Sequence, residues 1–219
     1  MKTTDIKNLK NNLPKSPSIM GKEEFYNTAV LVPLVQKEDQ IHLLFEERAS
    51  NIRQGGEICF PGGFYQKEID KDFSHTAVRE TTEELGVDSS CIQLLGPMDT
   101  FLAPMGVTVD PFVGILDIDD INELNIENQE VARVFLLPVS YFQTHPPEIY
   151  QIKLKAHPYE IKADGQTEIL LPSEKLGLPK IYHEPWGGVP LNVYVYHTPE
   201  AMIWGLTARI LYYLIQMIT

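Results

Sequence analysis

Four charged residues that could take part in catalysis lie within one short span of the sequence, namely Arg79, Glu80, Glu83 and Glu84. Residues three and four apart lie side by side on a helix, so a helix here would gather the three carboxylates into one patch. Adjacent carboxylates repel one another and resist ionisation unless a positive charge joins them. A hard divalent cation such as Mg²⁺ or Mn²⁺ prefers oxygen ligands. The spacing therefore predicts metal-assisted chemistry on an anionic substrate.

The flanking residues predict where this helix begins and ends. Pro61-Gly62-Gly63 precedes it as a turn, and Gly86 follows Leu85 where a left-handed C-terminal cap is expected. The less polar side of the helix would consist of Ala77, Val78, Thr81 and Leu85. A charged helix face is usually only solvated, but the glycine turn, the spaced acids and the terminal glycine together favour a metal site.

Residues 62–87 resemble the signature box of the Nudix hydrolases, which cleave a nucleoside diphosphate linked to another group. Residues 48–50, 56–63 and 203–209 resemble segments of the coenzyme A diphosphatase branch. The resemblance implies an α/β fold with a mixed sheet, the Nudix-type α/β/α sandwich, in a single elaborated domain over residues 1–219. It also implies hydrolysis of coenzyme A or acyl-CoA to 4′-phosphopantetheine, or its acyl form, and adenosine 3′,5′-bisphosphate.

The resemblance implies roles for the residues of the box. Glu80, Glu83 and Glu84 would bind Mg²⁺ or Mn²⁺, and a carbonyl of Gly62 or Gly63 would complete the ligand set. Arg79 would hold Glu80 in place by a charge-assisted hydrogen bond. The general base is left between Glu80 and a residue outside the box.

Residues outside the box are expected to complete the site. Nudix enzymes commonly take a further ligand or the base from a loop, and the acidic stretch 117–130 offers Glu130 first and Glu127 next. Arg48 and Arg53, just before the glycine turn, are the cations best placed to bind substrate phosphates, although surface salt bridges explain them equally well.

Two departures from the family pattern stand out. The segment from Gly63 to Arg79 is two residues longer than the common box, so no glutamate occupies the position of the first acid. Asp70 is the expected substitute for that acid. Thr81 occupies a position that is usually aliphatic.

Three alternatives remain open. The enzyme could act on NADH, ADP-ribose or a dinucleoside polyphosphate instead of coenzyme A. A nucleotide sensor without activity is a second alternative, although such a domain would be expected to lose the box glutamates that this chain keeps. A structural domain with an acidic surface helix is the third, and it predicts no stabilisation by metal.

Composition limits the classes of partner. The chain has 219 residues, 43% of them hydrophobic, and a formal net charge of −12. No stripe of lysine and arginine is present, which argues against a nucleic-acid surface. The N-terminus lacks a secretion-signal pattern, and Cys59 and Cys91 are expected to be reduced thiols, so a cytoplasmic protein is the default expectation. The expected partner is a small nucleoside diphosphate, with a homodimer left open.

The coarse pattern of elements is mixed. Helices are predicted over residues 4–13, after the glycine turn, and from about 199 to 217; strands are predicted over 27–36, 41–47, 57–60, 92–102, 107–116, 131–136 and 191–196, with a hairpin turn at Asp164-Gly165. Pro111 suggests an edge strand or a bulge. Arg209 and Gln216 interrupt the apolar run 201–218 of the last helix, which instead carries a stripe at helical spacing, made of Ile203, Leu206, Ile210, Leu214 and Met217. It is therefore expected to pack on the core and not to span a membrane.

Overall fold

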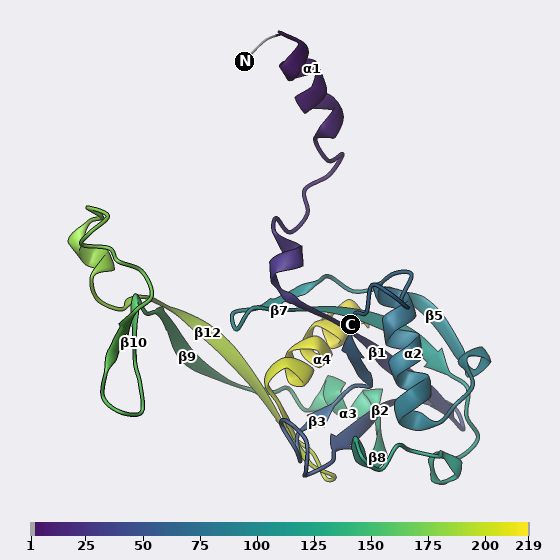
Figure 1. The fold of residues 1–219 in the computed structure, drawn as a ribbon. Coiled ribbons are helices and arrows are strands. Elements are labelled where there is room, and N and C mark those ends of the chain that lie inside the picture. Colours follow the sequence, from purple (N-terminus) through teal and green to yellow (C-terminus); the bar gives the residue numbers. More distant parts are fainter. Residues whose placement is uncertain (1–2, 219) are drawn as a thin grey trace.

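The computed structural model describes residues 3–218, and it centres on an eight-stranded mixed sheet (Figure 1). The strands of this sheet are β1 (Tyr26–Lys37), β2 (Gln40–Arg48), β3 (Ile58–Cys59), β4 (Gly62–Phe64), β5 (Ile92–Pro97), β6 (Phe101–Ala103), β7 (Val107–Leu116) and β8 (Val131–Pro138). The order along the main path is β3-β2-β1-β7-β5, with β4 beside β1, β6 beside β7 and β8 beside β2. β1 and β7 are parallel, and the other pairs in this sheet are antiparallel.

Helices cover both faces of the sheet because its central strands are apolar on both sides. Leu31 of β1 packs with Ala77 of α2 (Phe73–Leu85) on one face. Phe45 of β2 belongs to the larger core on the other face, which includes residues of α3 (Val139–Thr144) and α4 (Gly205–Ile218). This arrangement confirms the predicted α/β/α sandwich.

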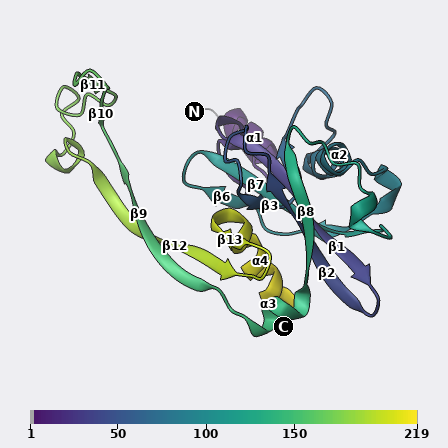
Figure 2. The ribbon, with the colours of Figure 1, turned by 90° about the horizontal axis from the view of Figure 1, so that it is seen from below.

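Two segments extend away from the eight-stranded sheet and its covering helices, which together we call the body. β9 (Glu148–Ala156) and β12 (Trp186–His197) form a long antiparallel ribbon, which we call the arm, and its far end carries β10 (Tyr159–Ile161) and β11 (Thr167–Ile169) (Figures 1 and 2). The base of β12 pairs with β13 (Met202–Trp204) beside α4. The helix α1 (Thr3–Asn12) also stands away from the sheet (Figure 1). Short 3₁₀ helices occupy Lys22–Glu24, Ser89–Cys91, Ile121–Glu123 and Lys180–Tyr182.

Most predicted elements are confirmed within a few residues, including the hairpin turn, where Asp164-Gly165 connects β10 to β11. The predicted start of the last helix was wrong. Residues 202–204 form β13, and a turn in which the Thr198 amide donates to the Ala201 carbonyl (3.2 Å) connects it to β12, so α4 begins at Gly205 and not near residue 199. The buried face of α4 also differs from the predicted apolar stripe, because Leu206 and Met217 are exposed while Ala208 and Leu211 are buried.

Two strand predictions also need correction. The predicted strand 92–102 is divided into β5 and β6, with a break after Pro97. Pro111 lies on β7 in the interior of the sheet and not at an edge, since β7 has β1 on one side and β5 and β6 on the other. It is tolerated there because it lies opposite the break between β5 and β6, where no paired strand would accept a hydrogen bond from a backbone N–H.

Candidate active site

The helix α2 has the boundaries that local sequence requires. Asp72 caps its N-terminus by accepting a hydrogen bond from the His75 amide (2.9 Å), and Gly86 ends it with a φ of 66°. Thr81 is buried, but its hydroxyl donates to the Ala77 carbonyl at 2.7 Å. That internal hydrogen bond explains why a polar residue is tolerated at this position.

The two glycines of β4 allow the helix to approach the sheet closely. A Cβ atom on Gly63 would lie 2.4 Å from Glu80 Cδ, and one on Gly62 would lie 2.3 Å from the Ala29 carbonyl oxygen. The Gly62 amide donates to Glu84 Oε2 at 2.8 Å. The pair therefore brings two box glutamates against a strand that has no side chains of its own there.

Asp70 and Arg79 form a two-point ion pair beneath α2. Arg79 Nε donates to Asp70 Oδ1 (2.9 Å) and Nη2 donates to Oδ2 (3.0 Å), while the Thr76 hydroxyl and the Gln66 amide also donate to Oδ2. The side chain of Asp70 is fully buried. The Arg79 guanidinium is the main cause that lowers the pKa of Asp70, and His75 contributes. The expected substitute for the first acid thus contacts the box arginine.

Arg79 also contacts two of the box glutamates. Its Nη1 atom lies 2.8 Å from Glu80 Oε1 and 3.0 Å from Glu83 Oε2. The predicted contact between Arg79 and Glu80 is therefore present. Glu83 is the more exposed of the two, with 60% of its side chain accessible against 13% for Glu80. Burial raises the pKa of Glu80, and the charge of Arg79 opposes that shift.

A buried pair of acids lies behind these groups. Glu84 is buried on α2, and burial together with the charge of Glu46 raises its pKa to about 9. Glu46 is buried on β2, where burial raises its pKa to about 7. The Cys59 thiol donates to Glu46 Oε1 (3.2 Å), and among the described residues no group hydrogen-bonds to Glu46 Oε2.

Glu46 was not among the site residues predicted from the sequence. The available signal was an acidic residue directly after the apolar run Leu43-Leu44-Phe45 in a predicted central strand. A carboxylate is almost never fully buried unless something pairs with it. Such a residue is therefore a candidate for a functional site, although only the strand register places it opposite Cys59.

The loop residues approach the same acids. Glu130 is exposed, yet its charge contributes to raising the pKa values of Glu46, Glu80 and Glu84. Its carbonyl accepts a hydrogen bond from the Ala49 amide (2.8 Å) at the end of β2. The Glu127 amide instead donates to the Glu84 carbonyl (2.9 Å). The structure thus gathers Glu130 with the box acids.

The two candidate phosphate-binding arginines differ in their surroundings. The charge of Arg48 opposes the rise in the pKa of Glu46, so the Arg48 side chain lies near the acidic site. Arg48 Nε donates to the Arg53 carbonyl at 3.2 Å, and the side chain of Arg53 is exposed. Arg48 is therefore near the buried acids, whereas the contact of Arg53 is through its backbone.

The acidic side chains lie near one another but do not form a complete metal-binding site. Over residues 3–218, no three His, Cys, Asp or Glu side chains converge closely enough to hold a metal ion as they stand. The guanidinium of Arg79 now pairs with Glu80 and Glu83. Cys59 and Cys91 are both free thiols, as expected. No helix in the described part of the chain is long and apolar enough to cross a membrane.

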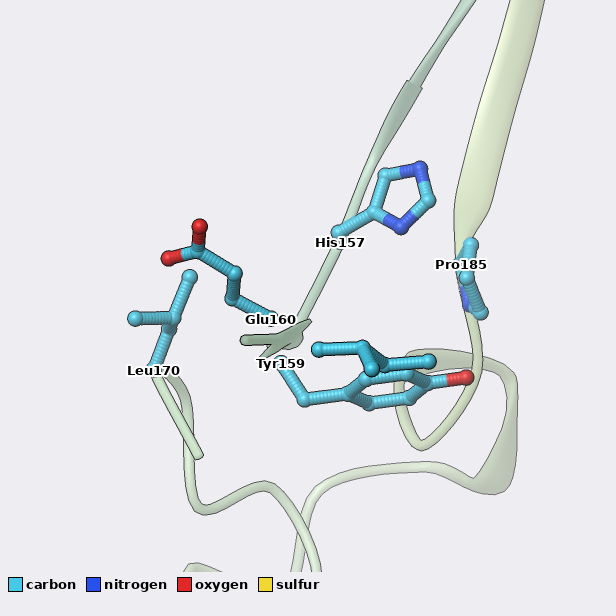
Figure 3. Close-up of a pocket in the computed structure, with 6 residues that line it drawn as sticks. His157, Tyr159, Glu160, Leu170 and Pro185 are labelled. Carbon is cyan, nitrogen blue, oxygen red and sulfur yellow. The ribbon is translucent and has the colours of Figure 1, made fainter. Parts of the chain in front are cut away.

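A separate depression lies at the far end of the arm. It is lined by His157, Tyr159, Glu160, Ile161, Leu170 and Pro185 (Figure 3). Both ribbon views place this end of the arm away from α2 (Figures 1 and 2). The depression is therefore not part of the acidic site.

Comparison with known proteins assigns the family. The NUDIX domain model matches residues 25–157. The peroxisomal coenzyme A diphosphatase NUDT7 of Mus musculus is 35% identical over 124 residues, which cover 56% of this chain and 51% of the mouse protein. The mitochondrial coenzyme A diphosphatase NUDT8 of Homo sapiens is 35% identical over 52% of this chain and 49% of its own length. The chain thus spans about half the length of these two relatives.

Other relatives match over more of their length. An uncharacterized Nudix hydrolase NudL of Photorhabdus laumondii is 27% identical over 94% of this chain and 91% of its own length. Among solved structures, the NUDIX domain of Shewanella oneidensis NrtR complexed with ADP ribose has a TM-score of 0.43 at 20% identity, covering 67% of this chain and 89% of that one. Because the domain model covers more than half of the chain and contains the acidic site, this protein belongs to the Nudix hydrolase family.

Proposed function

We propose that this Nudix hydrolase cleaves the diphosphate of coenzyme A or acyl-CoA with the help of Mg²⁺ or Mn²⁺. The observation that carries the proposal is the group of acids around the glycine pair, with Glu80 against Gly63 and the buried Glu84 bonded to the Gly62 amide. The coenzyme A assignment is supported by the two coenzyme A diphosphatases that share 35% identity with this chain. The expected products are 4′-phosphopantetheine and adenosine 3′,5′-bisphosphate.

The residues present fit a divalent cation. Burial, together with the charge of the buried Glu46, raises the pKa of Glu84, and Glu46 Oε2 has no hydrogen-bond partner among the described residues. A cation bound near these carboxylates would offset the repulsion between them and compensate for the missing hydrogen bond to Glu46 Oε2. Glu80, Glu83, Glu84 and the Gly63 carbonyl would hold it. When bound, the cation polarises the phosphate oxygens and lowers the pKa of a bound water.

The remaining residues position the reaction. Asp70 anchors the guanidinium of Arg79, and Arg79 keeps Glu80 beside Gly63. Glu80 or Glu130 accepts the proton of the attacking water, because both lie at the acidic group. Arg48, with Arg53 as the second candidate, neutralises the phosphate oxygens that would otherwise repel the nucleophile.

The test is mass spectrometry of the products formed from coenzyme A, NADH and ADP-ribose in ¹⁸O-labelled water, with and without Mn²⁺. We expect metal-dependent formation of 4′-phosphopantetheine and adenosine 3′,5′-bisphosphate, with the label identifying the phosphorus that water attacks. Cleavage of NADH or ADP-ribose alone would reject coenzyme A as the substrate. Failure to cleave any of these compounds would favour a nucleotide-binding sensor instead.

A further inference from the structure

The arm is amphipathic over residues 150–154 of β9 and the part of β12 that pairs with them. Residues paired across an antiparallel ribbon point to the same face, and neighbours along a strand alternate between faces. The register pairs Tyr150 with Val193 and Ile152 with Leu191, which places these four side chains on one face together with Leu154. We call these five residues the apolar face of the arm.

The opposite face of the arm is polar. It carries the pair Gln151 and Asn192, joined by a 3.2 Å hydrogen bond from Gln151 Nε2 to Asn192 Oδ1. Lys153 and Lys155 alternate onto this side as well. A clean alternation of this kind is typical of a sheet that has one face in water and one face buried.

Within residues 3–218 the apolar face is only partly covered: Leu191 and Val193 on β12 are partly buried, but the side chains on β9 are exposed. Tyr150 is 56% exposed, Ile152 is 48% exposed and Leu154 is 37% exposed. Figures 1 and 2 show the ribbon leaving the body, so α2, α3 and α4 lie away from its outer half. An isolated two-stranded ribbon is at best marginally stable in water. A further surface is therefore needed to cover this one.

We propose that the apolar face of the arm is a homodimer interface, in which the arms of two copies pack face to face. A two-fold axis requires a surface that is complementary to itself, and the five apolar side chains can pack against the same side chains of a second copy. Glu148 lies at the base end of this face, where it accepts a hydrogen bond from the Tyr150 hydroxyl. Sheets packed in this way bury their apolar side chains between them and leave the polar sides, here Gln151 and the two lysines, in water.

The distribution of charge favours a second copy at this place. Residues 148–197 contain five lysines and six acidic residues, a net charge of −1, so the rest of the chain carries −11 of the total −12. Two bodies of that charge repel each other. Contact through nearly neutral arms lets two copies associate while their acidic bodies stay apart.

The same distribution disfavours an anionic membrane as the partner. Membrane-binding segments combine apolar side chains with basic residues that reach the lipid headgroups. In this arm, Lys153 and Lys155 lie on the face opposite Ile152. In both ribbon views α2 lies across the body from the arm, so arm-to-arm contact leaves the acidic site open to substrate (Figures 1 and 2).

The experiment compares the full-length protein with two single variants by sedimentation equilibrium at micromolar concentration. We expect the wild type to be a dimer and Ile152→Lys to be a monomer, because the variant introduces a charge into the interface. The matched control is Gln151→Lys, which adds the same charge one residue away on the polar face and should remain a dimer. Circular dichroism and metal-dependent hydrolysis check that both variants are folded.

Hydroxyl-radical footprinting provides a second readout at the side chain itself. Tyr150 should be protected in the wild type and in Gln151→Lys but oxidised in Ile152→Lys, with the exposed Tyr213 of α4 as the internal reference. A monomeric wild type would overturn the proposal. So would a dimer that Ile152→Lys leaves intact, or a monomer that floats with vesicles of phosphatidylcholine and phosphatidylglycerol.

Discussion

Asp70 and Arg79, nine residues apart in the sequence, meet as a buried two-point ion pair with distances of 2.9 and 3.0 Å. The same guanidinium contacts Glu80 and Glu83. Asp70 therefore fixes the side chain that contacts two of the proposed metal ligands, which agrees with the expectation that it substitutes for the missing glutamate of the common box.

Replacing Asp70 with Asn should destabilise the protein by about 3 kcal/mol, since one partner of a buried ion pair would be lost while the other keeps its charge. Turnover should also fall, because Arg79 would no longer be fixed. The matched control is Asp72→Asn, which removes a neighbouring charge but keeps a side chain that caps the helix well. Urea unfolding measures both. Equal stability of the two variants would contradict the role given to Asp70.

The stability that Asp70 provides should depend on pH in one direction. Its folded-state pKa is lowered from the ordinary value of 3.8, mainly by Arg79. The contribution is therefore fully present above that value and is lost as the pH falls toward the lower folded-state pKa. The difference in unfolding free energy between wild type and Asp70→Asn should be constant near neutral pH and shrink below about pH 4. A difference that grows in acid would refute this assignment.

The sequence predicted the parts of the site that depend on local structure. The helix α2 follows from the capping residues and the spacing of its acids, and β1, β2 and β7 follow from apolar runs that the core requires. The Asp70–Arg79 pair could not be predicted as a contact, because it depends on how residues 64–72 fold back beneath α2. Glu46 was missed for a related reason, since only the pairing of β2 with β3 places it beside Cys59.

Only part of the arm was predicted, because residues 191–196 of β12 were expected as a strand but β9 was not. Between Glu148 and Ala156 the apolar residues alternate with glutamine and lysine, which does predict a strand, but the surrounding prolines obscured it. The start of α4 was misplaced because Ile203 fits a helical stripe as well as it fits a strand. Its pairing with Tyr196 decides in favour of the strand.

Replacing Glu84 with Gln should stabilise the metal-free protein at alkaline pH. The pKa of Glu84 is raised from 4.5 to about 9, so the folded state retains a proton that the unfolded chain releases as the pH rises through this window. Metal-free wild type must therefore lose stability from about pH 4.5 upward. The variant avoids that loss, while its amide oxygen still accepts from the Gly62 amide. Thermal unfolding in EDTA at pH 5 and pH 8 measures the effect, and a variant less stable than wild type at pH 8 would contradict it.

The same substitution should remove turnover. Glu84→Gln and Glu83→Gln are each expected to lower kcat by roughly 100-fold, or about 2.7 kcal/mol, because each removes a charged ligand of the proposed metal. Mn²⁺ should raise the melting temperature of the wild type and fail to raise that of Glu84→Gln. Full activity in both variants, with the fold intact, would reject the metal site.

Replacing Gly63 with Ala should displace Glu80, because the new Cβ would lie 2.4 Å from its carboxyl carbon. A displacement of about 1 Å in a positioned group can cost roughly 100-fold in rate, so kcat should fall by that order. Gly106→Ala is the control. It strains a glycine with φ of 79° but meets no atom within 4 Å, so it should lose some stability and keep its activity. Steady-state kinetics on the two variants separate the clash from general strain.

Glu46 provides the most specific test of the buried acids, because its neighbour Glu47 serves as a matched control on the same strand. Glu46→Gln keeps an oxygen for the Cys59 thiol but removes the charge that faces Glu84. We expect Mn²⁺ binding, measured by electron paramagnetic resonance, to weaken on the order of 10-fold, as is typical for a group that supports a metal ligand. Glu47→Gln breaks only a partly exposed pair with Arg133 (2.7 Å) and should leave Mn²⁺ binding unchanged. If both variants bind Mn²⁺ like the wild type, the buried charge of Glu46 serves no metal, and the unpartnered oxygen needs another explanation.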